Sequence, residues 1–379
     1  MTAVSVEPAV PASSAVAPPL LRMVRETPTD YWNDSCAIAE LEYAVARGAT
    51  GATSNPGIVL EVLGKERAHW EPWLREAAAA NPAGTEDDLT WALVEAMAAG
   101  GARVLEPVFR ETGGRKGRLS VQTDPRNHRN AERMLDQGRR FAALAPNLQV
   151  KFPATKAGLV AIEQATAAGV PVNATVSFTV SQAIAVGEAV ERGLDAFAAA
   201  GGDPASLAPV CTIMVGRLDD WLRVIVERDG LAVDPDALDW AGIATFKRAV
   251  ALYRERGFRT RLLAAAYRHR LHWTELVGGD VVLTMPHAWQ VRFNASGIVP
   301  VPRIDEPVEP RLVAELESRI PDFGRAYAPD GLSPVEFDTF GATVRTLRSF
   351  IGSYHDLAAA VRDVVLPDPD IRPAAGTPR

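Results

Sequence analysis

The chain has 379 residues, of which 47% are hydrophobic and 23% are charged, and its formal net charge is −7. This composition is typical of a globular protein with a large core, and it excludes a disordered or fibrous chain. An acidic chain lacks the basic surface that nucleic-acid binding requires, so we expect no nucleic-acid partner, although the charge is compatible with a local basic pocket for a phosphorylated small molecule.

The cysteines and histidines limit the redox and metal chemistry. Cys36 and Cys211 are too few for a disulfide framework, which favours a reducing compartment. His269 and His272 have no cysteine or acidic ligand at metal-site spacing, so we interpret them as a surface pair and predict no metal and no cofactor.

No stretch approaches the roughly 18 apolar residues of a membrane span, so we predict a cytoplasmic protein without a membrane partner.

Residues 1–28 are rich in alanine, proline, serine and valine and lack both a basic n-region and an unbroken apolar run, so we predict a flexible N-terminal arm.

From about residue 29, short β-like runs alternate with helical patterns. The first run is TDYWND, which Asp34 closes, and the second is ATGATSN, which ends at Asn55. Pro56 is well placed to open the following helix.

Six further strands are predicted along the chain, separated by helical patterns. They are GRLSVQTDP, LQVKFPAT, VPVNATV, LAPVCTIMV, TRLLAAA and GDVVLTM. Together with the first two they make about eight β-then-α units between residues 29 and 300. This alternation predicts an α/β fold of the (β/α)8 TIM-barrel class rather than separate sheets and bundles.

Residues 301–365 are predicted to add a C-terminal helical extension to the barrel. Residues 301–330 are proline-rich and read as irregular. Ser333, Pro334 and Glu336 supply the cap, the first-position proline and the capping-box acid of a helix start.

An apolar stripe at helical spacing follows, formed by Phe340, Val344, Leu347, Ile351 and Tyr354. It predicts a helix that docks on the barrel, and a lid over the mouth of the active site is the alternative. Residues 366–379 are predicted to be a tail.

The fourth predicted strand carries a lysine among apolar residues. Leu148, Val150 and Phe152 alternate with Gln149 and Lys151, so the lysine lies on the face opposite the apolar set. In a barrel the face towards the helices is apolar, and the inner face near the C-terminal strand ends carries the chemistry. Lys151 is therefore predicted to be inside, where desolvation lowers its pKa and leaves free amine for Schiff-base chemistry on a sugar carbonyl.

Neighbouring strands place polar residues with the same parity near their C-terminal ends. These residues are Asp34, Thr53, Asn55, Ser120, Gln122, Asp124, Asn173 and Thr175. Taken singly, most have a simpler explanation: an inward lysine can instead bind a phosphate, Asn55 can be only a turn residue before a proline, and Asp34 can be only a helix cap. Taken together around one lysine they are improbable as packing alone, because each would leave a buried polar group to satisfy.

Several segments resemble the transaldolase family, the class I Schiff-base transaldolases and fructose-6-phosphate aldolases. VKFPAT and the following VPVNATVSFTVSQA carry the most specific resemblance, and GATGATSNP and VGRLDDW add to it. The resemblance extends from about residue 29 to residue 295. It implies the barrel fold that the alternation of strands and helices predicts independently.

The resemblance also implies roles for individual residues. Lys151 would attack the ketose carbonyl, Asp34 would be the acid/base at the C4 hydroxyl, and Thr175 would help to position the catalytic water. The implied substrate-binding residues are Asn55, Asn173, Thr212, Arg217 and Arg268, of which the two arginines would bind phosphate.

Three positions depart from the usual family pattern. Gln122 stands where transaldolases usually carry a catalytic glutamate, Thr212 where a serine is usual, and Ala266 where a serine precedes the second phosphate arginine. A glutamine can orient a water but cannot titrate, so the first departure makes aldolase-like release of the intermediate more plausible. The other two change the phosphate and substrate pocket.

The leading hypothesis is a cofactor-free enzyme that transfers a dihydroxyacetone unit between phosphorylated sugars. The implied reaction is that of the pentose phosphate pathway, sedoheptulose 7-phosphate plus glyceraldehyde 3-phosphate to erythrose 4-phosphate plus fructose 6-phosphate, or a variant with another acceptor. One alternative is a fructose-6-phosphate-type aldolase that releases free dihydroxyacetone, and another is a non-catalytic sugar-phosphate-binding barrel. The residues leave the oligomeric state open, and a homo-oligomer is compatible with them.

Overall fold

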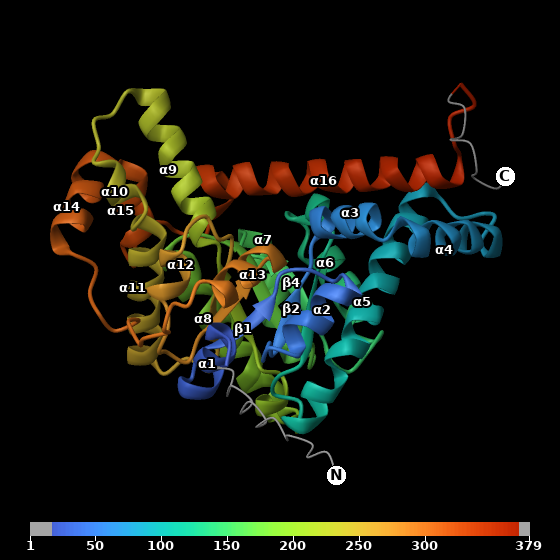
Figure 1. Cartoon of the computed structure of the whole chain (residues 1–379), viewed down its shortest axis with the longest axis horizontal. Helices are drawn as coiled ribbons and strands as arrows, with labels where there is room; N and C mark the ends of the chain where they lie inside the picture. Colours follow the sequence, from blue (N-terminus) through green and yellow to red (C-terminus); the bar gives the residue numbers. More distant parts are fainter. Residues whose placement is uncertain (1–16, 371–379) are drawn as a thin grey trace, which may run out of the picture.

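A computed structural model describes residues 17–370 of the chain. Eight parallel strands close into a barrel in sequence order, with β8 paired to β1 (Figure 1). The strands are β1 (Asp30–Asn33), β2 (Gly51–Thr53), β3 (Arg118–Gln122), β4 (Leu148–Pro153), β5 (Val172–Ser177), β6 (Val210–Ile213), β7 (Arg261–Ala264) and β8 (Val282–Met285). The predicted (β/α)8 fold is therefore confirmed, and each predicted strand is present.

Helices follow the strands and surround the barrel. They are α2 (Ile38–Val45), α3 (Pro56–Lys65), α4 (Arg67–Ala80), α5 (Glu86–Glu111), α6 (Ala131–Ala142), α7 (Lys156–Ala167), α8 (Val180–Ala199), α9 (Val215–Asp229), α10 (Pro235–Leu238), α11 (Ala241–Arg256), α12 (Leu271–Thr274) and α13 (His287–Ala295). Pro56 opens α3 as predicted, directly after the capping side chain of Asn55. Within residues 17–370, no helix is long and apolar enough to cross a membrane.

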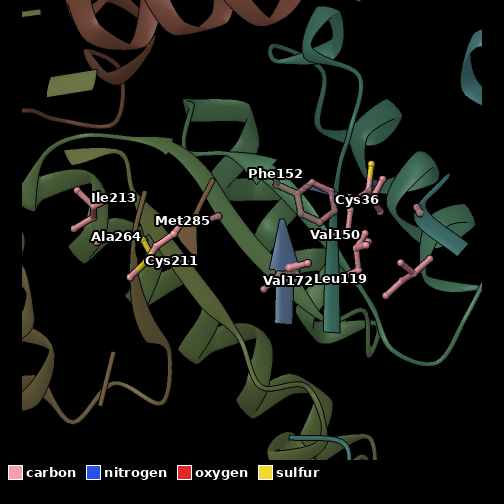
Figure 2. Close-up of a cluster of buried hydrophobic side chains, with 14 of the residues drawn as sticks. Cys36, Leu119, Val150, Phe152, Val172, Cys211, Ile213, Ala264 and Met285 are labelled. Atoms are coloured by element: carbon pink, nitrogen blue, oxygen red, sulfur yellow. The ribbon is translucent and has the colours of Figure 1, made fainter. Parts of the chain in front are cut away.

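The outer face of the strands packs against the helices. Val150 and Phe152 of β4 are fully buried in this layer, and a Cβ on Gly138 of α6 would lie only 2.6 Å from the Phe152 ring. Figure 2 shows part of this layer, including Leu119, Val172, Cys211, Ile213, Ala264 and Met285. Because side chains alternate along a strand, Lys151 lies on the inner face.

The interior of the barrel is apolar on one side and polar on the other. The apolar cluster consists of Trp32, Val210, Leu263, Ala265 and Val282. On the polar side, Ser120 donates a hydrogen bond to Gln149 (2.8 Å) and accepts one from Asn173 (3.1 Å). Ser120, Gln149 and Asn173 therefore form hydrogen bonds with one another, as buried polar side chains generally do.

The N-terminal segment differs from the predicted flexible arm. Residues Pro19–Glu26 form helix α1, and Leu20 and Met23 on its inner face are fully buried. The Trp273 indole N–H also donates to the sulfur of Met23 (3.2 Å). These two apolar residues, three positions apart, form the buried face by which the short helix docks. Residues 1–16 of the predicted arm lie outside the described residues.

The C-terminal extension contains more helix than the sequence predicted. Residues 301–330, expected to be irregular, include α14 (Pro310–Arg319) and α15 (Pro321–Tyr327). The long helix α16 (Gly341–Val365) begins at Gly341, so its predicted start at Ser333 is wrong. Ser333 N donates to Glu336 Oε2 (2.9 Å), which is one half of a capping box. The Ser333 hydroxyl donates to the same oxygen, Glu336 N donates to the Ser333 backbone oxygen, and the pair closes a turn ahead of the 3₁₀ helix η3 (Phe337–Thr339).

The predicted apolar stripe of α16 is only partly correct. Leu347 and Tyr354 are buried, but Val344 is 38% exposed and Phe350, outside the stripe, is buried. Figure 1 shows α16 running across one end of the barrel, from α9 to α4. The helix packs against α3, α4, α5 and α9. Of the predicted tail, residues 366–370 are exposed and the rest lie outside the described residues.

Candidate active site

A cavity of about 160 Å³ lies at the C-terminal ends of the strands, the end at which barrel enzymes carry their active sites. Seven of the nine predicted site residues line it: Asp34, Asn55, Lys151, Thr175, Thr212, Arg217 and Arg268. The other lining residues are Thr53, Met214, Ala265, Ala266, Tyr267, Thr284, Pro286 and Phe350. The fold therefore gathers most of the residues that the sequence singled out around one cavity.

Lys151 lies inside the barrel, as the strand parity predicted. Its side chain is 4% exposed, and Nζ donates to the backbone oxygen of Ser54 (3.2 Å). Burial lowers the pKa of Lys151 to about 8, against the opposing pull of the Asp34 charge, and Arg217 lowers it further. A useful fraction of the amine is then free base near neutral pH, which nucleophilic attack on a carbonyl requires.

Asp34 follows β1 and projects into the same cavity. Thr53 donates a hydrogen bond to its carboxylate (2.5 Å), and the Thr53 and Thr284 hydroxyls lie 2.7 Å apart. Burial raises the pKa of Asp34, while Lys151 and the Thr53 hydrogen bond oppose the shift. A carboxyl group with a raised pKa in the same cavity as the lysine is suited to give and take a proton.

Asn55 and Asn173 occupy different layers of the site. Asn55 lines the cavity while its side-chain oxygen caps α3 by accepting from Ile58 N (3.1 Å), so its cap function and its site position coexist. Asn173 lies next to Lys151 in the sheet register but does not line the cavity. It accepts a hydrogen bond from Thr212 (2.7 Å) and thereby holds that hydroxyl at the cavity floor.

Gln122 is the other predicted residue that does not line the cavity. It pairs with Lys151 in the β3–β4 register and is buried. Within residues 17–370, its side-chain oxygen and the hydroxyl of Thr175 have no hydrogen-bond partner. Unsatisfied polar atoms on either side of the lysine are suited to hold a water molecule or a substrate hydroxyl.

Two arginines supply the positive charge of the cavity. Arg217 stands on the first turn of α9 with its guanidinium 5.0 Å from the centre of the Phe350 ring, and it has no hydrogen-bonded or ion-paired side-chain partner within the described residues. Burial and the neighbouring Arg268 lower its pKa. Arg268 is held by Asp220, with Nη2 2.7 Å from the carboxylate. A half-buried guanidinium without a salt-bridge partner in the described residues, next to a second guanidinium, favours binding of an anion.

His269 and His272 are not the surface pair that the sequence suggested. His272 is fully buried with Nε2 2.8 Å from Asp219 Oδ2, while His269 Nε2 lies 3.8 Å from the same oxygen. The partner was missed because Asp219 is 53 residues away along the chain. The fold, rather than the local sequence, brings these groups together.

Asp219, His269 and His272 have potential metal ligands within 4.8 Å of one another, so their fit to a metal can be tested. The backbone N–H of Arg268 donates to His272 Nδ1 (3.1 Å), which places the proton of the neutral ring on Nε2. A histidine that binds a metal through Nε2 instead donates from Nδ1. The ring is therefore arranged for hydrogen bonding rather than for metal coordination.

Sequence reasoning missed several lining residues. Thr284 has the inward parity of a residue near the end of the last strand, so that pattern could have identified it. Phe350 gave no such signal, because it belongs to a helix whose buried face was assigned incorrectly. One of the two aromatic residues that line the cavity, Phe350, thus comes from the C-terminal extension, and the other, Tyr267, follows β7 of the barrel.

Known proteins resemble this chain over most of its length. A family model described as Transaldolase/Fructose-6-phosphate aldolase matches residues 31–319. A transaldolase from Parafrankia sp. is 29% identical over 340 residues, covering 82% of this chain and 91% of the relative. Transaldolase 1 of Streptomyces avermitilis is 31% identical over 268 residues, covering 65% and 70%, and the transaldolase of Mycobacterium ulcerans is 31% identical over 277 residues, covering 67% and 73%.

Proposed function

Because this chain belongs to the Transaldolase/Fructose-6-phosphate aldolase family, we propose that it is a transaldolase in which Lys151 forms the Schiff base. The enzyme transfers a dihydroxyacetone unit between phosphorylated sugars. The observation that carries the assignment of Lys151 is its position: a buried amine with a pKa of about 8 in a cavity that also holds Asp34 and Arg217.

The first half of the reaction makes and cleaves a ketimine. Lys151 Nζ adds to the C2 carbonyl of the donor ketose, and loss of water gives the protonated imine. Asp34 then takes the C4 hydroxyl proton while the C3–C4 bond breaks, and the electrons of that bond pass into the imine to give an enamine. The shortened aldose leaves, and the three-carbon unit stays on the lysine.

The second half reverses these steps on a new acceptor. The enamine attacks the aldehyde of the acceptor, and Asp34 returns its proton to the oxygen that becomes the new C4 hydroxyl. Water then hydrolyses the imine, and the free hydroxyl of Thr175 is placed to orient that water. Arg217 and Arg268, which both line the cavity, bind the phosphate of each sugar. The same residues thus serve both sugars.

The family assignment also gives the setting. A transaldolase acts in the pentose phosphate pathway, and we place this one in the cytoplasm because Cys36 and Cys211 are both free thiols. The substrate-binding roles of Asn55, Asn173 and Thr212 belong to the same proposal. Thr212 presents its hydroxyl to the cavity, whereas Asn173 acts through that hydroxyl from below.

Borohydride trapping tests the proposal directly. Reduction in the presence of fructose 6-phosphate should leave a stable dihydroxyacetone-derived adduct on the peptide that contains Lys151, detectable by mass spectrometry. The Lys151→Met variant should give no adduct and no turnover. If no ketose phosphate yields an adduct on Lys151, the mechanism is wrong, and binding without turnover in the native enzyme would support the non-catalytic barrel instead.

Gln122 supports a second candidate, an aldolase that releases free dihydroxyacetone. A glutamine beside the imine cannot titrate as the glutamate usual in the family can, so proton delivery to the intermediate is altered. A coupled assay that measures free dihydroxyacetone and the transfer product in the same reaction separates the two activities. A transaldolase forms mostly the transfer product when an acceptor aldose is present, and an aldolase releases the three-carbon unit regardless of the acceptor.

A further inference from the structure

A buried aspartate–histidine pair lies behind the phosphate arginines and outside the cavity wall. Asp219 of α9 and His272 of α12 are both fully buried, and neither lines the cavity. Asp219 accepts a hydrogen bond from Gly242 N (2.8 Å) on one oxygen and faces His272 Nε2 (2.8 Å) with the other. A buried charge is costly unless it is fully bonded, so this pair calls for a functional explanation.

The hydrogen bonds define the state of the histidine ring. The backbone N–H of Arg268 can only donate, so His272 Nδ1 accepts and Nε2 carries the proton given to Asp219. Burial lowers the pKa of His272, and Asp219 opposes this shift only in part. A neutral ring therefore links the Asp219 carboxylate to the backbone of Arg268.

The loop that carries Arg268 has a strained backbone, so it needs contacts such as this link to keep its shape. Ala266 has φ of +67°, a conformation that residues other than glycine rarely adopt. The loop also presses on the start of α9, where a Cβ on Gly216 would lie 1.9 Å from the Ala266 oxygen. A strained, tightly packed loop keeps its shape only when surrounding contacts hold it.

We infer that Asp219 and His272 are positioning residues for the substrate phosphate, acting through Arg268. This inference rests on the proposed function, in which Arg268 binds that phosphate. Two adjacent aspartates of α9 hold Arg268 at two points, because Asp219 fixes its backbone through His272 and Asp220 fixes its guanidinium directly (2.7 Å). The His269 ring, centred 3.9 Å from the His272 ring, covers the Asp219–His272 bond.

Two replacements of His272 separate its two nitrogens. In His272→Asn the side-chain oxygen occupies the Nδ1 position and can still accept from Arg268 N–H. An amide oxygen has no tautomer for Asp219 to fix, so this contact persists without the link to Asp219. In His272→Gln the amide can reach Asp219 but leaves Arg268 N–H without an acceptor. We expect His272→Gln to raise KM for the phosphorylated donor about tenfold, the effect of losing about 1.4 kcal/mol of binding, with kcat changed less than about twofold. His272→Asn should stay within about threefold of the native KM.

Asp219→Asn provides an isosteric second variant in case His272→Gln does not fold. Gly242 N–H holds the amide oxygen, so the amide NH2 group faces Nε2. Two donors cannot face each other, so the ring must move its proton to Nδ1, where it opposes the Arg268 N–H. We therefore expect the KM of Asp219→Asn to rise as in His272→Gln. Circular dichroism and urea unfolding of each variant establish that it is folded.

Binding of sulfate, a tetrahedral dianion, tests the inference without catalysis. Isothermal titration calorimetry should show the sulfate Kd rising about tenfold in His272→Gln and Asp219→Asn, but not in His272→Asn. This readout holds even if the enzyme turned over no ketose, so it separates failure of the inference from failure of the proposed function. Equal effects of the Asn and Gln variants, or lost stability with unchanged KM and Kd, would overturn the positioning role.

Discussion

At the scale of single residues, Lys151 shows the cost of keeping a nucleophile inside the protein. Its pKa falls from 10.5 to about 8 because the charged form is desolvated. The unfolded chain therefore binds this proton more tightly than the folded protein does. The charged lysine destabilises the fold below pH 8, and the penalty fades as the pH rises from about 8 to 10.5.

This sign predicts an unusual stability profile for Lys151→Met. At pH 7 the variant should be more stable than the native enzyme by about 1–3 kcal/mol, since it removes a buried charge that is paired only in part. The difference should shrink as the pH is raised towards 10. Urea unfolding of both proteins between pH 6 and 10 measures it, with Lys156→Met on the outside of the barrel as the control. A variant less stable than the native enzyme at pH 7 would contradict the assigned burial penalty.

The sequence predicted the location of Lys151 because side-chain direction in a strand has a strict period of two. The same parity brought Asp34, Asn55 and Thr175 to the cavity wall. Parity predicts whether a side chain points into the barrel, but not how far along the barrel axis it lies. It therefore could not show that Thr212 lines the cavity whereas Asn173 lies behind Thr212. Contacts between distant segments, such as Asp219 with His272, follow no local pattern and were missed.

At the scale of elements, α16 shows why a helix boundary is difficult to predict. Only the contact of Glu336 with the Ser333 backbone forms as the capping box requires, and the chain continues into a turn. The helix begins at Gly341, where a Cβ would lie 2.0 Å from the Trp221 ring of α9. A tertiary contact therefore decides where α16 starts, and with it which face of the helix is buried.

The position of α16 predicts a role for Phe350 in substrate choice. Its ring lines the cavity and lies over Arg217, so Phe350→Ala should widen the space beside the phosphate site. We expect kcat/KM for a longer acceptor aldose to rise about tenfold relative to a shorter one, in line with the selectivity of one or two methylene-sized contacts. Assays with glyceraldehyde 3-phosphate, erythrose 4-phosphate and ribose 5-phosphate measure this ratio.

Val344→Ala is the matched control on the exposed side of the same helix, where the side chain is 38% accessible. It should leave the acceptor preference unchanged. If both variants change the preference equally, or if neither does, α16 only covers the barrel and does not contribute to specificity.

At the scale of the whole molecule, the extension shares a core with the active site. Beside the main core between strands and helices, a second hydrophobic cluster joins Phe323 of α15 and Phe340 to Leu218 of α9. This second core includes the cavity residues Met214 and Phe350. At its other end α16 is tied to α5 by Arg362 and Glu86 (2.6 Å). The sequence separated barrel from extension along the chain, because it does not reveal which apolar residues pack across that boundary.

A shared core predicts that barrel and extension unfold together. Phe323 is fully buried, so Phe323→Ala should lower the free energy of unfolding by about 3–5 kcal/mol through lost burial and a residual cavity. Because the same core supports α9, which carries Arg217, the variant should also raise KM for the phosphorylated donor. Val335→Ala, at a position 61% exposed in the extension, should change neither quantity.

Far-UV circular dichroism and tryptophan fluorescence during urea unfolding provide the measurement. The chain has eight tryptophans, so the emission of Trp221 is obtained as the difference between the native enzyme and Trp221→Phe. Trp221 of α9 donates to Asp322 of α15 (2.8 Å), so this difference signal reports on the second core, whereas the far-UV signal reports mainly on the helices of the barrel. Coincident transitions in both signals, shifted together by Phe323→Ala, are expected for one cooperative unit. An early fluorescence transition that leaves the helical signal and the sulfate affinity intact would make the extension a separate domain. The enzyme would then owe its phosphate site to the barrel alone.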